Sequence, residues 1–361
     1  MENKFLKYFL AANSGEGFVS HFADNYDYTD GWRAYIIKGG PGTGKSSFMK
    51  YVAVKAIDIG YNVELCPCSS DPDSLDGVIV KDKKIIILDG TAPHVVEPKF
   101  AGICEEIINL GQFWNGEKLR KKADEIIAIT AQNKKLHKTA AAYISAAGEL
   151  IFDNFKLSKN FIKYNKCEKF AQNIAVQLFP GKTGHQPREW TRFIGGVTPK
   201  GVIAFKSTVE DFYKDIIVID DKYGTVANVI MQKIRETALD KGYEIITLKN
   251  PFLPSKIIDH VLIPELSLAV VREYDYIKWG ESHRRIHARR FYDINVLREH
   301  RPRLTFNRRV TRELLLGAIE TLGKAKAVHD VLEKYYIDSM DFKSMTLFAE
   351  EKAKEILMHN A

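Results

Sequence analysis

The sequence contains one pattern twice, and this repetition restricts the possible folds more than any other feature. Matching stretches recur at a nearly constant separation of 182 to 184 residues. The matched pairs are Phe9 and Phe193, Gly17 and Gly201, Ile36-Ile37 and Val218-Ile219, 60–65 and 242–247, 78–80 and 261–263, and 85–88 and 268–271. Any one match is compatible with chance, but a constant separation across distant segments indicates internal duplication. We therefore expect two copies of one folding unit.

Each copy shows the order of elements that is typical of an α/β unit. A short apolar strand leads into a turn and a helix, and two further apolar strands follow. This alternation favours a mostly parallel sheet with right-handed crossovers and helices on its faces. Behind each sheet, at about 117–170 and about 309–358, apolar residues lie three and four positions apart. That spacing predicts a helical appendage after each sheet.

A segment rich in proline and glycine marks the boundary between the two copies. Two prolines and two glycines fall within 178–187 and interrupt both the strand and the helix periodicity. We place a linker at 178–190, a first domain with its appendage at 1–177, and a second domain at 191–361. The length of 361 residues suits two domains of ordinary size.

The first copy carries a complete P-loop between a strand at 33–38 and a helix that follows. The motif residues are Gly39, Gly40, Pro41, Gly42, Thr43, Gly44, Lys45, Ser46 and Ser47. Its glycines permit positive φ, so that successive backbone N–H groups face a phosphate chain at the positive end of a helix. Lys45 supplies a cation for the β- and γ-phosphates, and the Ser46 hydroxyl can ligate Mg²⁺. The motif predicts nucleotide binding, with ATP and Mg²⁺ as cofactors.

A candidate metal-binding carboxylate ends the third strand of the first copy. Asp89 follows four apolar residues at 85–88, which is the form of a Walker B strand whose aspartate reaches Mg²⁺. An aspartate in this position can also be a simple turn residue. Together with the P-loop, the metal role is the interpretation that we adopt.

Hydrolysis also needs a residue that orients or deprotonates water. The glutamate that often follows a Walker B aspartate is replaced here by Gly90, so we take His94 as the catalytic candidate. His94 lies after a strand, at the sheet edge where ligands bind, although a packing histidine is an equal alternative. Other candidates are Thr91 and Glu97 in the same segment, and Asp73 and Asp76 after the second strand.

The second copy has lost the chemical groups of the first P-loop. A separation of 182 residues aligns Gly39-Gly40 with Asp221-Lys222, Gly44 with Val226, Lys45 with Ala227, and Ser46 with Asn228. The phosphate-binding lysine and the metal-binding hydroxyl are gone, and a carboxylate has appeared that would repel a triphosphate. In the third strand Arg272 stands in place of Asp89. We interpret the second copy as a domain that keeps the fold without the nucleotide chemistry.

Arginine is concentrated in one segment of the second copy, 284–312, which holds ten of the sixteen arginines. Because guanidinium groups match phosphate geometry, three interpretations compete. The segment could supply an arginine finger to the first P-loop, bind nucleic acid or another polyanion with Phe291 and Tyr292 available for stacking, or form a solvated helical face. The sequence does not choose among them.

Composition limits the class of protein. Hydrophobic residues make up 45% and charged residues 27%, with a net charge of +7, as in a soluble globular protein. No apolar run approaches the roughly 18 to 20 residues that cross a bilayer. The N-terminus lacks the apolar core of a signal peptide, so we expect a cytoplasmic protein without a membrane partner. The four cysteines do not form a disulfide or zinc pattern, and we expect no metal site apart from nucleotide-bound Mg²⁺.

Several of these segments resemble the signatures of a family of uncharacterised bacterial tandem P-loop ATPases, in which one chain carries two copies of this unit. The similar segments are Ile36 to Ser47, Cys68 to Gly77, Leu88 to His94 and Ile108 to Gly111. The resemblance implies ATP binding and hydrolysis, without an established substrate. Members often look able to bind nucleotide in both halves, from which this chain departs.

The leading functional hypothesis is therefore an ATPase with one competent site, Lys45 and Asp89 acting with His94. One alternative is a small-molecule or nucleotide kinase in which the helical appendage forms a lid and the arginines hold an acceptor phosphate. The other is an ATP-gated module that binds nucleic acid or a polyanion. The oligomeric state stays open.

Overall fold

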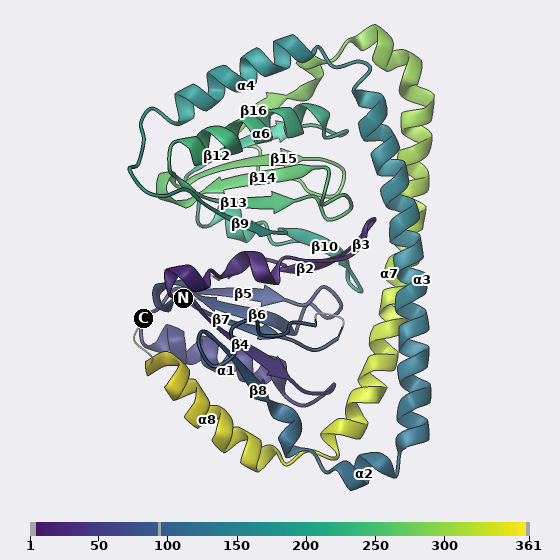
Figure 1. Cartoon of the computed structure of the whole chain (residues 1–361). Coiled ribbons are helices and arrows are strands. Elements are labelled where there is room, and N and C mark those ends of the chain that lie inside the picture. Colours follow the sequence, from purple (N-terminus) through teal and green to yellow (C-terminus); the bar gives the residue numbers. More distant parts are fainter. Residues whose placement is uncertain (1–4, 93–94, 359–361) are drawn as a thin grey trace.

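The computed structural model describes residues 5–92 and 95–358, which form two six-stranded α/β sheets (Figure 1). The first sheet has the order β1 (Leu6–Lys7), β5 (Val63–Pro67), β6 (Leu75–Val80), β7 (Ile85–Asp89), β4 (Arg33–Lys38), β8 (Glu105–Asn109). The second has the order β9 (Arg188–Arg192), β13 (Glu244–Lys249), β14 (Ile258–Ile263), β15 (Leu268–Glu273), β12 (Asp215–Asp220), β16 (Arg284–His287). The two orders correspond strand for strand.

Both sheets are mostly parallel, as the sequence predicts, apart from one strand in each. β4 runs parallel to β7 and β8, whereas β6 is antiparallel to both of its neighbours. The cause is the connection between β6 and β7, a single 3-10 turn at Lys81–Lys83. A parallel pair needs a crossover of a dozen residues or more, so this short turn imposes an antiparallel pair. β14 and β15 repeat the arrangement around the turn at Pro264–Leu266.

Backbone details that the alignment did not address also repeat. Lys84 and Ser267 are the described non-glycine residues with positive φ, at 52° and 49°, and each ends the turn before the third strand. Phe9 and Phe193 donate backbone hydrogen bonds to each other's carbonyls, both at 2.9 Å. A reciprocal pair of equivalent residues is what an approximate two-fold axis produces. The two sheets are therefore related by such an axis, which passes between these residues.

Helices account for most of the rest of the chain. They are α1 (Lys45–Asp58), α2 (Gly116–Arg120), α3 (Ala123–Ser158), α4 (Tyr164–Leu178), α5 (Ser207–Glu210), α6 (Thr225–Asp240), α7 (Ile294–Ile337) and α8 (Phe342–Met358). Short 3-10 turns are η1 (Phe22–Asn25), η2 (Tyr28–Asp30), η3 (Lys81–Lys83), η4 (Leu110–Phe113), η5 (Pro264–Leu266) and η6 (Ala288–Phe291). The hairpins β2 (Ala11–Ser14) with β3 (Gly17–Ser20) and β10 (Gly195–Thr198) with β11 (Gly201–Ala204) lie between the sheets.

The two helical appendages exchange places between the sheets. α3 leaves the first sheet and leads to α4, which packs on α6 of the second sheet. α7 runs back antiparallel to α3 and leads to α8, which packs on α1 of the first sheet (Figure 1). The division by sequence grouped each appendage with the sheet that precedes it. In space, the last helix of each appendage covers the sheet of the other half: α4 covers the second sheet and α8 covers the first.

The exchange is fixed by close packing at the centre. α3 and α7 approach each other through small residues, with Ala140 and Ala318 both fully buried. Gly15 touches Gly148 of α3 so closely that a Cβ built on Gly15 would lie 2.9 Å from the Gly148 Cα. A side chain at either position would force the hairpin away from the helix.

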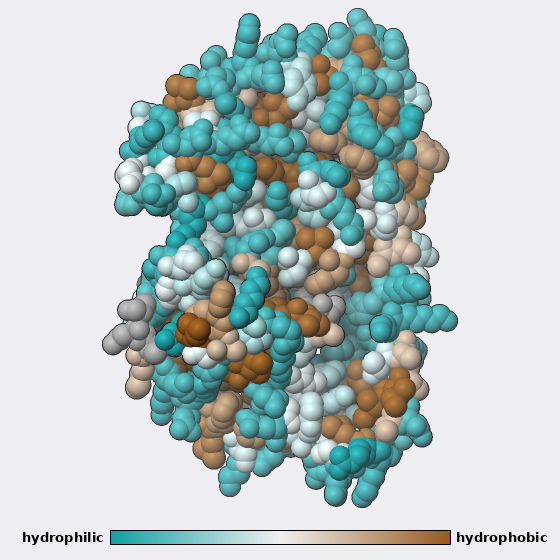
Figure 2. Space-filling view, in the orientation of Figure 1, coloured by the Kyte–Doolittle hydropathy of each residue, from teal (hydrophilic) through white to brown (hydrophobic). Residues whose placement is uncertain are grey.

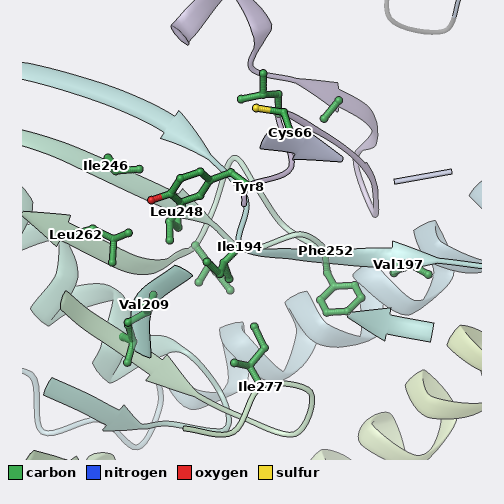
Figure 3. Packing of buried hydrophobic residues seen from close by; sticks show 14 of the residues in the cluster. Tyr8, Cys66, Ile194, Val197, Val209, Ile246, Leu248, Phe252, Leu262 and Ile277 are labelled. Carbon is green, nitrogen blue, oxygen red and sulfur yellow. The ribbon is translucent and has the colours of Figure 1, made fainter. Parts of the chain in front are cut away.

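One hydrophobic core joins the two sheets (Figure 3). It contains Tyr8 and Cys66 from the first half and Ile246 and Leu262 from the second, together with residues of α3 and α7. A buried ion pair also crosses between the halves: Arg192 Nη1 lies 2.6 Å from Glu64 Oε2, and both side chains are almost inaccessible. Among the described residues, no helix has the length and apolar character that crossing a bilayer requires.

Candidate functional site

The glycine loop, Gly39–Ser47, leaves the carboxyl end of β4 and leads into α1. β7 lies beside β4 in parallel register, with Ile37 paired to Asp89, so the loop and Asp89 share one edge of the sheet. Gly42 and Gly44 have φ of 66° and 85°, a conformation that only glycine adopts without strain. Thr43 is fully buried, and its hydroxyl donates to the Gly40 carbonyl at 2.8 Å, which fixes the turn.

The Lys45 ammonium lies inside this turn. Its Nζ donates to the carbonyls of Gly40 at 2.8 Å and Gly39 at 3.3 Å. Asp89 Oδ2 lies 3.7 Å away, and both side chains are 13% exposed. The loop therefore holds a positive charge whose nearest partners are two neutral carbonyls and one carboxylate at the limit of an ion pair.

Two oxygen ligands predicted from the sequence take part in local hydrogen bonds. Ser46 Oγ accepts from the Leu75 N–H at 3.0 Å, which ties the start of α1 to β6. Asp89 Oδ1 accepts from the backbone N–H of Thr91 at 2.9 Å and from its hydroxyl at 2.5 Å. Both oxygens keep lone pairs. Among the described residues no group of three or more His, Cys, Asp or Glu side chains could hold a metal by itself.

The last turn of α7 lies directly over the glycine loop. A Cβ built on Gly42 would lie 2.8 Å from the Glu333 carbonyl oxygen and 2.9 Å from Ile337, and one built on Gly40 would lie 2.7 Å from the Tyr336 ring. Two more side chains complete this cover, namely Trp114, whose ring centre is 5.9 Å from that of Tyr336, and Met345 of α8, which meets Gly44. We call these five residues the cover.

Glu333 places a negative charge in contact with the loop. Its carbonyl and Cβ lie against Gly42, and its Oε1 lies 3.4 Å from His329 Nε2. The hydrogen bond with His329 is the largest effect and lowers the pKa of Glu333, burial opposes it, and Lys326 and the Gly42 N–H lower it further. A carboxylate of α7 therefore lies beside the glycine loop, although it belongs to a distant part of the chain.

The counterpart loop, Asp221–Val229, is closed by its own side chain. The Asp221 carboxylate accepts from the N–H of Tyr223 at 3.1 Å, from the N–H of Ala227 at 2.9 Å and from the Tyr292 hydroxyl at 2.7 Å. Asp221 is fully buried. A carboxylate therefore occupies the middle of the loop, bonded to the residue that aligns with Lys45.

Arg272, which aligns with Asp89, holds this closed loop in place. Its guanidinium donates to the Asp221 carbonyl at 2.8 Å, to the Lys222 carbonyl at 3.2 Å and to Asp259 Oδ1 at 2.8 Å, all away from solvent. A Cβ built on Gly224 would lie 3.0 Å from the guanidinium. Burial acts to lower the pKa of Arg272, but Asp259 and Asp221 outweigh it and the pKa is raised. This ion pair occupies the position beside the counterpart loop that Asp89 occupies beside the glycine loop.

The remaining predicted residues fall in different places. His94 lies outside the described residues. Glu97 is tethered to Lys38, whose Nζ lies 2.5 Å from Glu97 Oε1 and also donates to the carbonyls of Gly90 and Val96. Asp73 is exposed and forms an ion pair with Lys200 of the second half at 2.6 Å. Asp76 is buried.

The arginine segment 284–312 lies at the end of α7 opposite to the glycine loop. Arg312 precedes Glu333 by 21 residues in one continuous helix, which corresponds to about 30 Å. Within one chain, no arginine of the segment can therefore act as a finger on this loop. Several of these side chains instead pair with carboxylates: Arg303 with Asp153, Arg308 with Asp275, and Arg285 with Glu273.

The kinase alternative included a helical lid, but sequence reasoning did not identify the residues of the cover. Glu333 and Tyr336 lie almost 300 residues from the glycine loop in the chain, on a helix whose pattern predicts only amphipathic packing. Trp114 follows the stretch Ile108 to Gly111, which drew attention only through the resemblance. No spacing rule connects these positions, because the contact results from the exchange of appendages.

Comparison with known proteins adds no relative. No model of a protein family matches the chain, and no curated protein and no solved structure matches it with significance.

Proposed function

We propose that this chain is a Mg²⁺-dependent ATPase with one nucleotide site, at the glycine loop, and a second half that keeps the fold without binding nucleotide. The observation that carries the proposal is the contrast between the charges inside the two loops. The glycine loop contains no acidic residue and holds the Lys45 ammonium between two carbonyls, whereas the counterpart loop is filled by its own Asp221. A loop that holds a cation and is not closed by a carboxylate of its own is equipped to bind a phosphate.

The residues at the glycine loop fit such a ligand. Lys45 is held by two neutral carbonyls and can turn to phosphate oxygens once the cover moves away from the loop. Ser46 and Asp89 are the protein oxygens that would hold Mg²⁺, which commonly keeps waters and phosphate oxygens as its other ligands. When bound, the metal neutralises charge on the β- and γ-phosphates.

Nucleotide entry requires the cover to move. Glu333 and the phosphates are both negative, so a phosphate beside Gly42 and the Glu333 carboxylate repel each other. Because Glu333 belongs to the 44-residue helix α7, its displacement shifts the end of an element that reaches the second half. Nucleotide binding is then coupled to the position of α7.

The decisive experiment compares the aligned positions of the two loops. Lys45→Ala should reduce MgATP affinity and ADP formation at least a hundredfold, because the cation for the phosphates is lost. Ala227→Lys should leave nucleotide binding unchanged, because Asp221 already fills that loop. Calorimetric titration with MgATP and a coupled ADP assay measure both. Retained binding in Lys45→Ala, or a second bound nucleotide in Ala227→Lys, would contradict the proposal.

As a second candidate we propose phosphoryl transfer to a small acceptor, favoured by one feature beside the cover. A hollow of about 540 Å³ lies where the segment that leads into α2 meets the connection between α7 and α8. Trp114, which covers Gly40, is part of its wall. Its other lining residues include Asn115, Asp338, Asp341 and Ser344, which can hydrogen-bond an acceptor. A metabolite that accelerates ADP formation and appears as a phosphorylated product would favour this kinase over the ATPase.

A further inference from the structure

We propose that the outer face of the first third of α7 binds single-stranded nucleic acid, with its arginines on the phosphates and Phe306 against a base. The face surrounds a hollow of about 490 Å³ lined by Arg298, Arg301, Pro302, Thr305, Phe306 and Arg309. We call these residues, together with Arg312, the arginine face. In Figure 2 the part of the molecule where α7 begins shows a mostly hydrophilic surface.

The arginines of this face are not used by the fold. Arg298, Arg301, Arg309 and Arg312 are all exposed, and the ion pairs found among residues 5–92 and 95–358 include none of them. Glu299 and Glu313 are exposed on the same helix and do not join these arginines in an ion pair of the described chain. The neighbouring Arg303 and Arg308, by contrast, each clamp an aspartate.

The arrangement suits a charged strand. At 3.6 residues per turn the four arginines fall within about 100° of the helix, and they extend over about 21 Å along it. One strand of nucleic acid in B-form carries a phosphate about every 3.4 Å along the axis, so several phosphates can lie along this face. Guanidinium groups also bind phosphate in a bidentate manner.

An aromatic ring supplies the second element of single-strand recognition. Phe306 is 52% exposed, and the Arg309 guanidinium lies over its ring, 5.6 Å from the centre. Leaving an aromatic ring in water has no benefit for folding, but bases stack on such rings without regard to sequence. Duplex DNA offers no unstacked base to this ring, so the observations favour a single strand.

The duplicated half provides an internal comparison. The N-caps Asn115 and Asp293 are equivalent, so residues of α2 and α3 correspond to residues of α7 found 178 positions later. The counterparts of Arg301, Phe306 and Arg309 are Ala123, Ala128 and Ala131. Only Arg120 and Lys134, the counterparts of Arg298 and Arg312, keep a charge. The fold therefore does not require the arginine face.

The test uses anisotropy of a short fluorescent oligodeoxythymidine with the full-length chain. Arg301→Ala with Arg309→Ala should weaken binding at least tenfold and reduce the slope of log affinity against log salt by about 1.4, for two lost phosphate contacts on a single strand. The charge-matched control, Arg120→Ala with Lys134→Ala, should change affinity less than twofold. Phe306→Ala should weaken binding of oligodeoxythymidine about tenfold and leave an abasic oligomer unaffected.

Three outcomes would overturn this inference: no binding at about 50 mM salt, equal losses in the two double variants, or polyglutamate and anionic vesicles competing as well as the oligonucleotide. Far-ultraviolet circular dichroism checks that each variant folds. The proposed ATPase activity is tested separately, because Lys45→Ala leaves the arginine face intact.

Discussion

The glycine loop and the counterpart loop begin and end at equivalent residues, yet they adopt different structures. Each follows a strand, β4 or β12, and leads into a helix that ends at an equivalent position, Asp58 or Asp240. In the counterpart loop the helix begins two residues earlier, at Thr225 instead of the position aligned with Lys45. The length of chain is unchanged, so the residues of the loop decide its shape.

The difference shows what keeps such a loop open. The first loop, Gly39–Ser47, contains no acidic residue, so an anion must come from elsewhere. In the second loop Asp221 supplies two local acceptors, and the chain closes around it. A carboxylate inside a loop thus satisfies the backbone and removes the ligand site in one step.

The largest expected effect is the difference in stability between a variant of Arg272 and a variant of Asp89, which occupy equivalent positions. Arg272→Met should lower the free energy of unfolding by about 3–5 kcal/mol, because Asp259 is left as an unpaired buried charge. Asp89→Ala should cost only about 1 kcal/mol, since it removes hydrogen bonds to Thr91 at the edge of the sheet. Urea denaturation measures both values.

The same two variants should affect ADP formation in the opposite order. Asp89→Ala should abolish Mg²⁺-dependent ADP formation, whereas Arg272→Met should retain it in the folded fraction. Combining Arg272→Met with Asp259→Asn should restore part of the lost stability, because Asp259 no longer leaves an unpaired buried charge. Equal stability losses for Arg272→Met and Asp89→Ala would show that the two loops do not differ in the way described.

A smaller effect concerns pH. His260, next to Arg272, aligns with Gly77 of the first half. Burial lowers the pKa of His260 to about 4, Asp259 partly offsets this, and Arg272 lowers it further. Its Nδ1 accepts from the Arg272 N–H at 3.1 Å, which requires the neutral ring, and its other close neighbour is the Trp279 ring.

Between about pH 4 and 6.5 the unfolded chain therefore binds a proton that the folded chain does not. Stability should rise with pH in this window, by up to about 3 kcal/mol from this residue. His260→Gln should reduce the dependence of the free energy of unfolding on pH in this window. Urea denaturation of both proteins across the window measures this dependence. An unchanged pH dependence in the variant would contradict the assignment.

The smallest expected effect concerns the cover. Glu333→Gln removes the negative charge beside Gly42, and should raise MgATP affinity about tenfold, as expected when one repulsive charge contact of about 1.4 kcal/mol is lost. Glu320→Gln is the matched control, because Glu320 pairs with Lys324 on the exposed side of the same helix. A fluorescent ATP analogue reports both affinities. No gain in Glu333→Gln would mean that the carboxylate does not repel the phosphates.

Much of the fold followed from local patterns. Apolar runs predicted the strands, their alternation with helices predicted two mostly parallel sheets, and the repeat predicted that both would be alike. The pairing of β4 with β7 brings Lys45 and Asp89 to one edge, where the motifs suggested that they would be. The antiparallel β6 was missed, although the short turn at Lys81–Lys83 was the signal.

The residues that make up the site were harder to predict from the sequence. An amphipathic helix reveals that it will be buried, but not against which sheet, because the apolar stripe fits either one. The sequence division consequently kept each appendage with its own sheet, and the arginine segment could still be imagined beside the first loop. The length of α7 excludes that arrangement and brings Glu333 there instead.

The sequence by itself determined that this chain is a duplicated α/β protein with one glycine loop intact and one altered, because local backbone preferences and aligned residues are written into it. Only the tertiary structure decided what covers each loop. Two long helices exchange between the halves, since their small residues meet at the centre, and this packing joins residues almost 300 positions apart. Such contacts depend on the geometry of the whole chain, which no local pattern contains.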